Sequence, residues 1–357
     1  MKIVQVMPEF GLAGAEIMCE NLTYALHDLG HEVTVISMYD YHSAITERLE
    51  QSGIRIICLN KKSGLDFSLI RKMKKAFKEI KPDVVHTHRY CAQYAIPAAI
   101  SAGIRSRVHT FHSIAQKENG MLARLVNGFF FKRCHLVPVA LSELVRDSIV
   151  EEYGIKSEKI PVVFNGIDLS KCKPKDGYSV NGNFKVLHIG RFAEPKNHSG
   201  LLKAFEKFHR IRPDSELWLV GDGEKRPEIE EFIKENNLED SVKLFGLQSN
   251  VHGFLHDADI FTLPSNYEGI PMTLIEAMGT GLPIVATAVG GVPDMLTNGE
   301  NALLVENDID QISAAFDAYY NSAELRKAHG EKAKERSVAF SAATMAQKYE
   351  SIYSLKT

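Results

Sequence analysis

The chain has 357 residues, of which 45% are hydrophobic and 24% are charged, and its formal net charge is -3 at pH 7. This length exceeds what one hydrophobic core usually serves, so we expect two domains. The near-neutral charge argues against a nucleic-acid-binding protein, and no apolar run approaches the roughly 18 residues of a membrane span. Five cysteines lie far apart without a C-x-x-C pair, which favours the reducing cytosol over a disulfide-bonded fold.

The first half of the chain alternates short apolar runs with helical patterns. We expect strands at residues 2–7, 31–38, 54–59, 83–88, 107–112 and 136–141. Alternation of strand and helix is typical of a parallel sheet with helices on both faces. The glycine-containing segment PEFGLAGAE follows the first strand and precedes the first helix. The first half is therefore predicted to be a doubly wound α/β domain.

The second half repeats this pattern after a polar, lysine-rich stretch, KCKPKDGYSVNGN. We expect further strands at residues 181–190, 216–221, 241–246, 258–265, 282–287 and 302–305. The predicted domains are residues 1–172 and 173–338, followed by a C-terminal helix within 339–357 that can cross back to the first domain. Doubly wound sheets bind ligands at the carboxyl ends of their strands, so we expect the site in a cleft between the two sheets.

The segment EGIPMTLIEAMGTGLPIVAT places two carboxylates beside the start of an apolar helix. Pro271 suits the first helical turn, the free N–H groups there form an anion site, and Gly269 lets the backbone approach a ligand. Glu268 and Glu276 would repel a phosphate but suit sugar hydroxyls, which donate to carboxylates. For an isolated pair of glutamates with this spacing, a simpler explanation is favoured, in which Glu268 caps the helix and Glu276 lies on its solvated face. The glycines, Pro271 and the helix start favour a sugar and phosphate site here.

The segment HIGRFAEPKN places Arg191 and Lys196 just after the first strand of the second domain. A departing diphosphate needs its charge neutralised by a metal or by fixed cations. Arginine grips phosphate oxygens in a bidentate way and lysine adds a point charge. We expect no metal site, so these two side chains are predicted to bind the diphosphate. Taken alone, Arg191 and Lys196 are explained equally well as two ordinary surface cations.

Two histidine pairs lie on neighbouring strands of the first domain. His86 and His88 share a strand face, and because no third ligand is evident, packing or acceptor contact explains them better than a metal. His109 and His112 face opposite ways, and His112 stands at the strand end. His112 is therefore the better candidate for an active site.

Together these segments resemble the retaining GT-B glycosyltransferases of family 4, over nearly the whole chain and in the right order. AGAEIMCENLTYALHDLGHEVTVIS is similar to the family's opening loop and first helix, and KPDVVHTH and VHTFHS resemble its histidine segments. FNGID matches its inter-domain turn, and GRFAEPKN and EGIPMTLIEAMGTGLPIVAT are the most specific segments. One departure is Ala13-Gly14, where the family usually has Gly-Gly. The resemblance implies two Rossmann-like domains facing a central cleft, the first on the acceptor side.

The resemblance also implies residue roles. Arg191 and Lys196 would bind the donor diphosphate, and Glu268 would contact the sugar ring. Glu276 would hold the ribose hydroxyls, and His112 would face the sugar near the reacting carbon. The implied catalytic residues are His112, Glu268, Arg191 and Lys196. Further implied donor contacts are Gly14, Gly246, Leu247, Val251, Gly269, Ile270, Pro271, Met272, Thr273 and Leu274.

The predicted function is a cytoplasmic, metal-independent, retaining transfer of a sugar from a nucleotide-diphosphate donor to an acceptor hydroxyl. By resemblance, the donor is a UDP-sugar, no cofactor is needed, and the acceptor is a glycan or a lipid-linked glycan in bacterial polysaccharide or glycolipid assembly. Three alternatives remain: a non-catalytic nucleotide-sugar-binding partner of another transferase, a sugar-nucleotide epimerase, and a dinucleotide-dependent oxidoreductase. The glycines at 11 and 14 give only a weak signal for the last.

The charge is unevenly distributed along the chain. Residues 1–170 carry a net charge of +3, and the remainder carries -6. The segment 61–81 is rich in lysine and arginine, and the segment 122–133 mixes apolar bulk with Arg124, Lys132 and Arg133. Such segments predict peripheral contact of the first domain with the inner face of a membrane, although solvated helix faces explain them as well.

Overall fold

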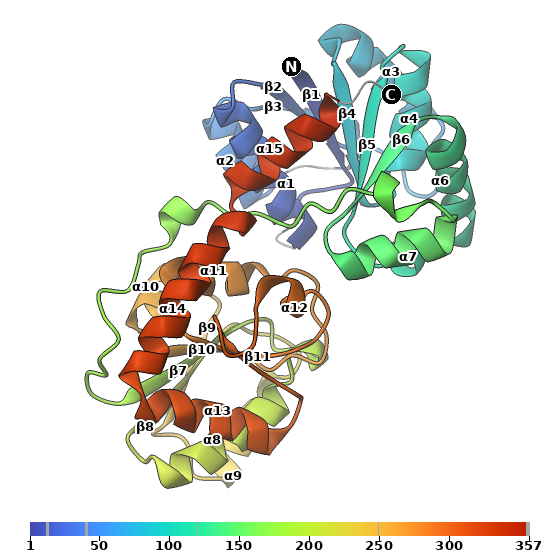
Figure 1. Ribbon diagram of the computed structural model, residues 1–357. Helices are drawn as coiled ribbons and strands as arrows, with labels where there is room; N and C mark the ends of the chain where they lie inside the picture. The colour runs from blue at the N-terminus through green and yellow to red at the C-terminus, as the bar shows by residue number, and fades with distance from the viewer. Residues whose placement is uncertain (12–13, 40–41, 119, 249, 355–357) are drawn as a thin grey trace. The chain divides into compact units, whose positions relative to one another are not determined.

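The computed structural model describes residues 1–11, 14–39, 42–118, 120–248 and 250–354. The chain divides into two compact units (Figure 1). The first contains residues 1–166 and the C-terminal segment from Ala342, and the second contains residues 167–341. Each unit is built on one six-stranded parallel sheet. The predicted class, two doubly wound α/β domains, is confirmed.

The sheet of the first unit has the strand order β3-β2-β1-β4-β5-β6. Its strands are β1 (Lys2–Met7), β2 (Glu32–Ser37), β3 (Arg55–Cys58), β4 (Val84–His88), β5 (Ser106–Phe111) and β6 (Leu136–Ala140). Strand order reverses between β1 and β4, which pair in parallel from Ile3 opposite Val84. Such a switch point is where doubly wound sheets bind ligands.

The helices of the first unit pack on both faces of this sheet. They are α1 (Gly14–Asp28), α2 (Ala44–Gln51), α3 (Ser68–Ile80), α4 (Ala92–Ser101), α5 (Ala115–Glu118), α6 (Met121–Arg133), α7 (Glu143–Tyr153) and α15 (Ala342–Tyr353). Helices α3 and α4 share one apolar cluster with the sheet, and α1 and α15 share another. Local signals set the helix ends: Ser142 caps α7 by accepting from the N–H of Val145, and Gly154, with φ +60°, ends it.

The C-terminal helix α15 belongs to the first unit, where it lies against α1 (Figure 1). The hydroxyl of Tyr349 lies 2.7 Å from Thr110 Oγ1, and the hydroxyl of Tyr353 lies 2.7 Å from His86 Nδ1. Both tyrosines are buried. The helix is therefore held by buried polar contacts to β4 and β5 as well as by apolar packing.

The second unit repeats the architecture with the strand order β12-β11-β10-β7-β8-β9. Its strands are β7 (Phe184–Ile189), β8 (Ser215–Val220), β9 (Val242–Gly246), β10 (Ile260–Leu263), β11 (Ile284–Thr287) and β12 (Leu303–Val305). All of the twelve predicted strands are therefore present, with ends that differ by at most three residues. The switch point lies between β7 and β10, which pair at Ile260 opposite Val186.

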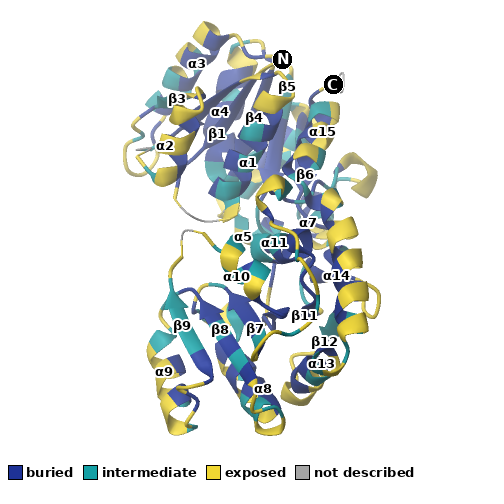
Figure 2. Ribbon diagram, turned by 90° about the vertical axis from the view of Figure 1, so that its left-hand side faces the viewer, coloured by how far each residue is buried: buried dark blue, intermediate teal, exposed yellow. Residues whose placement is uncertain are grey.

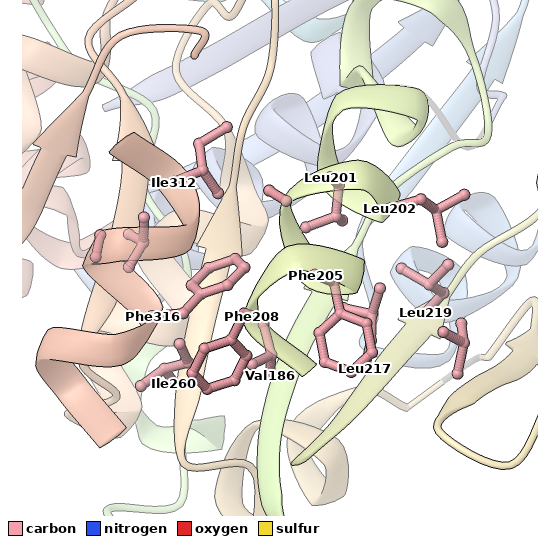
Figure 3. Packing of buried hydrophobic residues seen from close by; sticks show 14 of the residues in the cluster. Val186, Leu201, Leu202, Phe205, Phe208, Leu217, Leu219, Ile260, Ile312 and Phe316 are labelled. Carbon is pink, nitrogen blue, oxygen red and sulfur yellow. The ribbon is translucent and has the colours of Figure 1, made fainter. Parts of the chain in front are cut away.

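The helices of the second unit are α8 (His198–Ile211), α9 (Arg226–Glu235), α10 (His252–Asp257), α11 (Met272–Thr280), α12 (Val292–Met295), α13 (Ile309–Asn321) and α14 (Ala323–Ser337). Figure 3 shows the core that α8 and α13 form with the sheet: Phe208 of α8 lies near Phe316 of α13, and Phe205 of α8 lies near Leu217 of β8. The rings of Phe208 and Phe316 meet edge to face, with centroids 5.8 Å apart. The central strands β10 and β11 are buried, the edge strand β9 is only partly buried, and the outer sides of α9 and α14 are exposed (Figure 2).

Candidate active site

An ion pair lies at the switch point of the second sheet. Lys196 ends the short 3-10 turn Glu194–Lys196 that follows β7, and Glu268 lies in the loop that follows β10. Lys196 Nζ lies 2.6 Å from Glu268 Oε1, and the side chain of Lys196 is 21% exposed while that of Glu268 is 8% exposed. The two most specific sequence segments thus meet at the carboxyl edge of adjacent strands, where a ligand is expected.

The loop after β10 is held in place by contacts that the sequence motif does not reveal. Ser265 donates its hydroxyl hydrogen to Glu268 Oε1 at 2.6 Å, and Thr287 donates to the carbonyl of Ser265 at 2.6 Å. Gly290 packs against the backbone of Glu268: a Cβ at position 290 would lie 1.7 Å from the Glu268 carbonyl oxygen, and its φ is +56°. Glu268 is therefore fixed from β11 as well as from β10. Sequence reasoning missed Ser265 and Gly290, although the Gly290-Gly291 pair after β11 was a visible signal.

The helix α11 begins beside this carboxylate. It starts at Met272, with Pro271 in the N-cap position, one residue before the first-turn position predicted for it. The N–H of Leu274 bonds to the carbonyl of Pro271 at 3.1 Å. Among the residues that the structure describes, the N–H groups of Met272 and Thr273 are given no acceptor. These two groups form the open, positively polarised end of the helix, while Gly269 and Ile270 lie in the loop leading to it.

Glu276 lies one turn further along α11, and its surroundings are unlike those of Glu268. Burial raises the pKa of the Glu276 carboxyl to about 7. Burial is the only cause of this shift, and within its described ranges the structure gives the carboxyl neither a hydrogen-bond donor nor a cation. A desolvated carboxyl without a donor is costly unless a ligand supplies one. Glu276 is therefore suited to accept from hydroxyl groups.

The remaining predicted residues of this unit follow neighbouring strands. Arg191, after β7, is 74% exposed and pairs with Glu224 at 3.0 Å. Gly246 ends β9 with φ +66°, Leu247 is 79% exposed, and Val251 is the N-cap of α10. Ser249, between the implied donor contacts Leu247 and Val251, lies outside the described residues. These positions all lie at the carboxyl edge of the sheet, but the structure brings only Lys196 and Glu268 into direct contact among the predicted side chains.

In the first unit, the predicted residues lie near its own switch point. Gly14 is the first residue of α1, and Ala13 lies outside the described residues. His112 follows β5 directly, and its Nε2 lies 3.0 Å from Nδ1 of His88 at the end of β4. Burial, reinforced by nearby His109 and Arg89, lowers the pKa of His112 to about 3. His112 is therefore neutral at physiological pH.

The other histidines of these strands are structural. His86 lies between the hydroxyls of Tyr353 and Thr110, each 2.7 Å from a ring nitrogen, and His109 Nδ1 lies 2.9 Å from Thr87 Oγ1. Burial holds the pKa of His86 well below its usual range. The prediction of packing rather than a metal pair agrees with these contacts.

Metal ligands were not expected, yet the sequence contains two D-x-D triplets, at residues 257–259 and 308–310. The first precedes β10, at the amino edge of the sheet, and Asp259 accepts from the N–H of Lys185 at 2.8 Å. In the second, Asp308 caps α13, and Asp310 pairs with Lys207 at 2.6 Å. The second triplet follows Asn307, which accepts from the side-chain amide of Asn197 at 2.7 Å, so it lies on the same side of the sheet as Lys196. The described part of the chain contains no group of three or more His, Cys, Asp or Glu placed to hold a metal ion.

The length and polarity of the helices decide whether any of them could span a membrane. Over the described residues, every helix is too short or too polar to cross a bilayer.

Comparisons with known proteins find glycosyltransferases along nearly the whole chain. A family model described as "Glycosyltransferase Family 4" matches residues 12–171, and one described as "Glycosyl transferases group 1" matches residues 173–336. N-acetyl-alpha-D-glucosaminyl L-malate synthase of Bacillus anthracis is 27% identical over 96% of this chain and 94% of its own. A UDP-Gal:alpha-D-GlcNAc-diphosphoundecaprenol alpha-1,3-galactosyltransferase of Escherichia coli is 28% identical over 70% of this chain and 71% of its own.

Solved structures share the fold. A glycosyltransferase of Rickettsia africae superposes with a TM-score of 0.86 at 22% identity, over 99% of this chain and 97% of its own. HepE of Anabaena, in complex with UDP, also has a TM-score of 0.86, at 21% identity, over 99% of this chain and its own full length. The two family models together span residues 12–336 apart from one. The chain belongs to the group 1 glycosyltransferases, and it is a transferase with two Rossmann-like domains of the GT-B fold.

Proposed function

We propose that this glycosyltransferase moves a sugar from a UDP-sugar to an acceptor hydroxyl, with retention of anomeric configuration and without a metal. The observation that carries the proposal is the Lys196–Glu268 pair beside the open N-terminus of α11, at the switch point of the second sheet. A cation and free N–H groups suit a diphosphate, and a fixed carboxylate suits sugar hydroxyls. Few ligands other than a nucleotide sugar present both groups side by side.

The proposed step assigns each side chain a task. Lys196, with the N–H groups of Met272 and Thr273, neutralises the diphosphate as its bond to the anomeric carbon breaks. The electron pair of that bond leaves with the diphosphate. The acceptor oxygen attacks from the same face, and its proton passes to a diphosphate oxygen. Glu268 orients the sugar, and Arg191 turns from Glu224 to the outer phosphate.

UDP is the proposed nucleotide because HepE of Anabaena, a protein of the same fold, has been crystallised with UDP and with UDP-glucose. Glu276 would accept the two ribose hydroxyls, which gives its desolvated carboxyl the donors that it lacks. A lipid-linked acceptor is proposed from the name of the Escherichia coli relative, which is that of a diphosphoundecaprenol-dependent enzyme. We propose that the enzyme works in the cytoplasm, in bacterial polysaccharide or glycolipid assembly.

A thermal-shift screen against UDP-, GDP- and ADP-sugars tests the donor, because a ligand that binds only the folded state stabilises it. We expect stabilisation by UDP-sugars that persists in EDTA and is lost in Glu276→Ala. The anomeric signal of the product, followed by NMR, tests retention. No shift with any donor would contradict the proposed function, and a shift that requires a divalent cation would contradict metal independence.

We also propose that the first unit contacts an anionic membrane surface through α6. The exposed apolar side chains of this helix, each at least 58% exposed, are Met121, Leu122, Leu125 and Phe129. Residues 121, 125 and 129 are spaced four apart and share one face of the helix. Exposed Lys132 and Arg133 end the helix and supply the charge that favours anionic lipid.

Co-sedimentation with phosphatidylglycerol vesicles tests this contact. Wild-type protein is expected to bind at low salt and to be released at high salt, and Phe129→Glu is expected to bind weakly. Ile211→Glu is the matched control, because Ile211 is 60% exposed but belongs to the second unit. Absence of salt-sensitive binding, or equal loss in both variants, would overturn the proposal.

A further inference from the structure

A chain of buried hydrogen bonds in the first unit leads from α1 to His112. It runs through Thr23, Gln5 and His88, and each link is between 2.6 and 3.1 Å long. We infer that Gln5 and His88 are positioning residues, which fix the tautomer of His112 so that its Nδ1 is always a hydrogen-bond acceptor. The inference deepens the proposed function, on which it rests for the use of His112, by stating what His112 can bind.

The first link fixes the orientation of the Gln5 side-chain amide. The hydroxyl of Thr23 donates its hydrogen to the carbonyl of Cys19 at 2.7 Å, one turn earlier in α1. The Thr23 oxygen can then only accept, and it lies 2.6 Å from Gln5 Nε2. If the amide were turned over, two oxygen lone pairs would face each other at this distance. Gln5 Oε1 therefore points the other way, towards His88.

The second link fixes the proton of His88. Gln5 Oε1 can only accept, and it lies 3.1 Å from His88 Nε2. His88 Nε2 must therefore carry a hydrogen. His88 is fully buried, and burial and the neighbouring histidines hold its pKa well below its usual range. A neutral imidazole carries one hydrogen, so His88 Nδ1 has a free lone pair.

The third link transfers this constraint to His112. His88 Nδ1 lies 3.0 Å from His112 Nε2, which must therefore donate. Because His112 is also neutral, its remaining nitrogen, Nδ1, is an acceptor. Within the described ranges, the structure assigns this nitrogen no partner. A ligand at the end of β5 thus meets a fixed lone pair.

A fixed acceptor limits what His112 can do in the transfer. It can accept from a sugar hydroxyl, but it cannot donate to a phosphate or carbonyl oxygen. His112 is thereby suited to orienting a neutral sugar, and the diphosphate is left to the cations of the second unit. The same chain of bonds explains why buried polar residues such as Gln5 lie in the middle of an otherwise apolar strand.

Long-range nitrogen–proton NMR of protein with labelled imidazoles reads the tautomers directly. We expect both His88 and His112 to carry their hydrogen on Nε2 at pH 7, with assignment by His112→Ala. In Gln5→Met, which removes the acceptor but keeps the size, we expect His88 to populate both tautomers. A wild-type His112 protonated on Nδ1, or on both nitrogens, would overturn the inference whether or not the protein transfers sugar.

Kinetics test the positioning role. In His88→Asn, the amide oxygen can take the place of the Nδ1 acceptor, whereas His88→Leu offers none. We expect kcat to fall about 10-fold or more in the leucine variant and to recover in the asparagine variant, with UDP affinity unchanged in both. Equal kcat in folded leucine and asparagine variants would overturn the role. Absence of transfer by wild-type protein, with the tautomers as expected, would contradict the proposed function and leave the tautomer assignment standing.

Discussion

The carboxyl edges of the two sheets are equivalent places in the fold, but the predicted site residues there differ in charge. At the β7/β10 switch point, the polar groups are charged: Lys196 pairs with Glu268 at 2.6 Å beside a helix N-terminus. On the strands beside the β1/β4 switch point, His88 and His112 are neutral because burial lowers their pKa. The same topology therefore places a charged pair at one edge and, at the other, two neutral imidazoles beside the ion pair of Arg89 and Glu16, whose atoms lie 2.7 Å apart.

This difference teaches that topology fixes where a ligand binds, while local burial fixes what kind of ligand it is. In the second unit, Lys196 and Glu268 remain charged because each is the ion-pair partner of the other. In the first unit, the hydrogen bond between His88 and His112 joins neutral imidazoles, since a buried imidazolium without a carboxylate beside it would be costly.

The largest expected effect comes from breaking the charged edge. In Lys196→Ala, the proposed diphosphate site loses its partly buried cation, and Glu268 is left without its ion-pair partner. We expect kcat/KM to fall on the order of 100- to 1000-fold. Steady-state transfer with a UDP-sugar measures this.

A double-mutant cycle with Glu268→Ala is the control. The two residues touch, so their effects should not add, and the double variant should be little worse than either single one. Near-normal rates in both single variants would remove the Lys196–Glu268 pair from the active site.

A smaller effect is expected at Glu276, where function and stability should oppose each other. The pKa of this carboxyl is raised to about 7, so the native state binds a proton more tightly than the unfolded chain does. Its contribution to stability is present below about pH 4.5 and is lost as the pH rises through 7. Glu276→Gln should therefore raise the unfolding free energy at pH 8 by roughly 1–3 kcal/mol and lower UDP affinity by about 10- to 100-fold.

Urea unfolding at pH 8 and pH 4.5, together with UDP titration, separates these two effects. The stability gain should be present at pH 8 and absent at pH 4.5. A variant that binds UDP normally would show that Glu276 does not hold the ribose. A loss of stability at pH 8 would show that the carboxylate has a partner in the free protein.

The sequence predicted the twelve strands because buried parallel strands are apolar runs with clear ends, but it did not predict the strand order that sets the two switch points. The family resemblance assigned Lys196 to the donor diphosphate and Glu268 to the sugar ring, but their direct contact was not predicted. The sequence could not reveal Ser265 or Gly290 as supports of Glu268, because their contacts depend on how two loops pack together. The role of Gln5 was hidden because a single polar residue in an apolar strand has no sequence pattern.

A third prediction tests the loop geometry that holds Glu268. Gly290→Ala puts a Cβ 1.7 Å from the Glu268 carbonyl oxygen, at φ +56°, so the loop after β10 must move. We expect a loss of about 1–3 kcal/mol of unfolding free energy, with a fall in kcat. Gly269→Ala is the control for the fold, because a Cβ there meets nothing within 4 Å. A Gly290→Ala protein with wild-type stability and rate would show that this contact is not needed to position Glu268.

The smallest expected effect concerns the buried hydrogen bonds between neutral groups in the first unit. The buried hydroxyl of Tyr349 bonds to Thr110 Oγ1 at 2.7 Å and so ties α15 to β5. Tyr349→Phe leaves Thr110 with one partner fewer, and we expect a loss of about 1 kcal/mol in urea unfolding. Tyr320→Phe is the matched control in the second unit, since its hydroxyl bonds to Asp214 at 2.7 Å at the exposed surface. Solvent can replace that bond, so its loss should cost less than about 0.5 kcal/mol. If the two variants lose equal stability, burial does not strengthen the neutral network, and the contrast between the two edges lies in their charge alone.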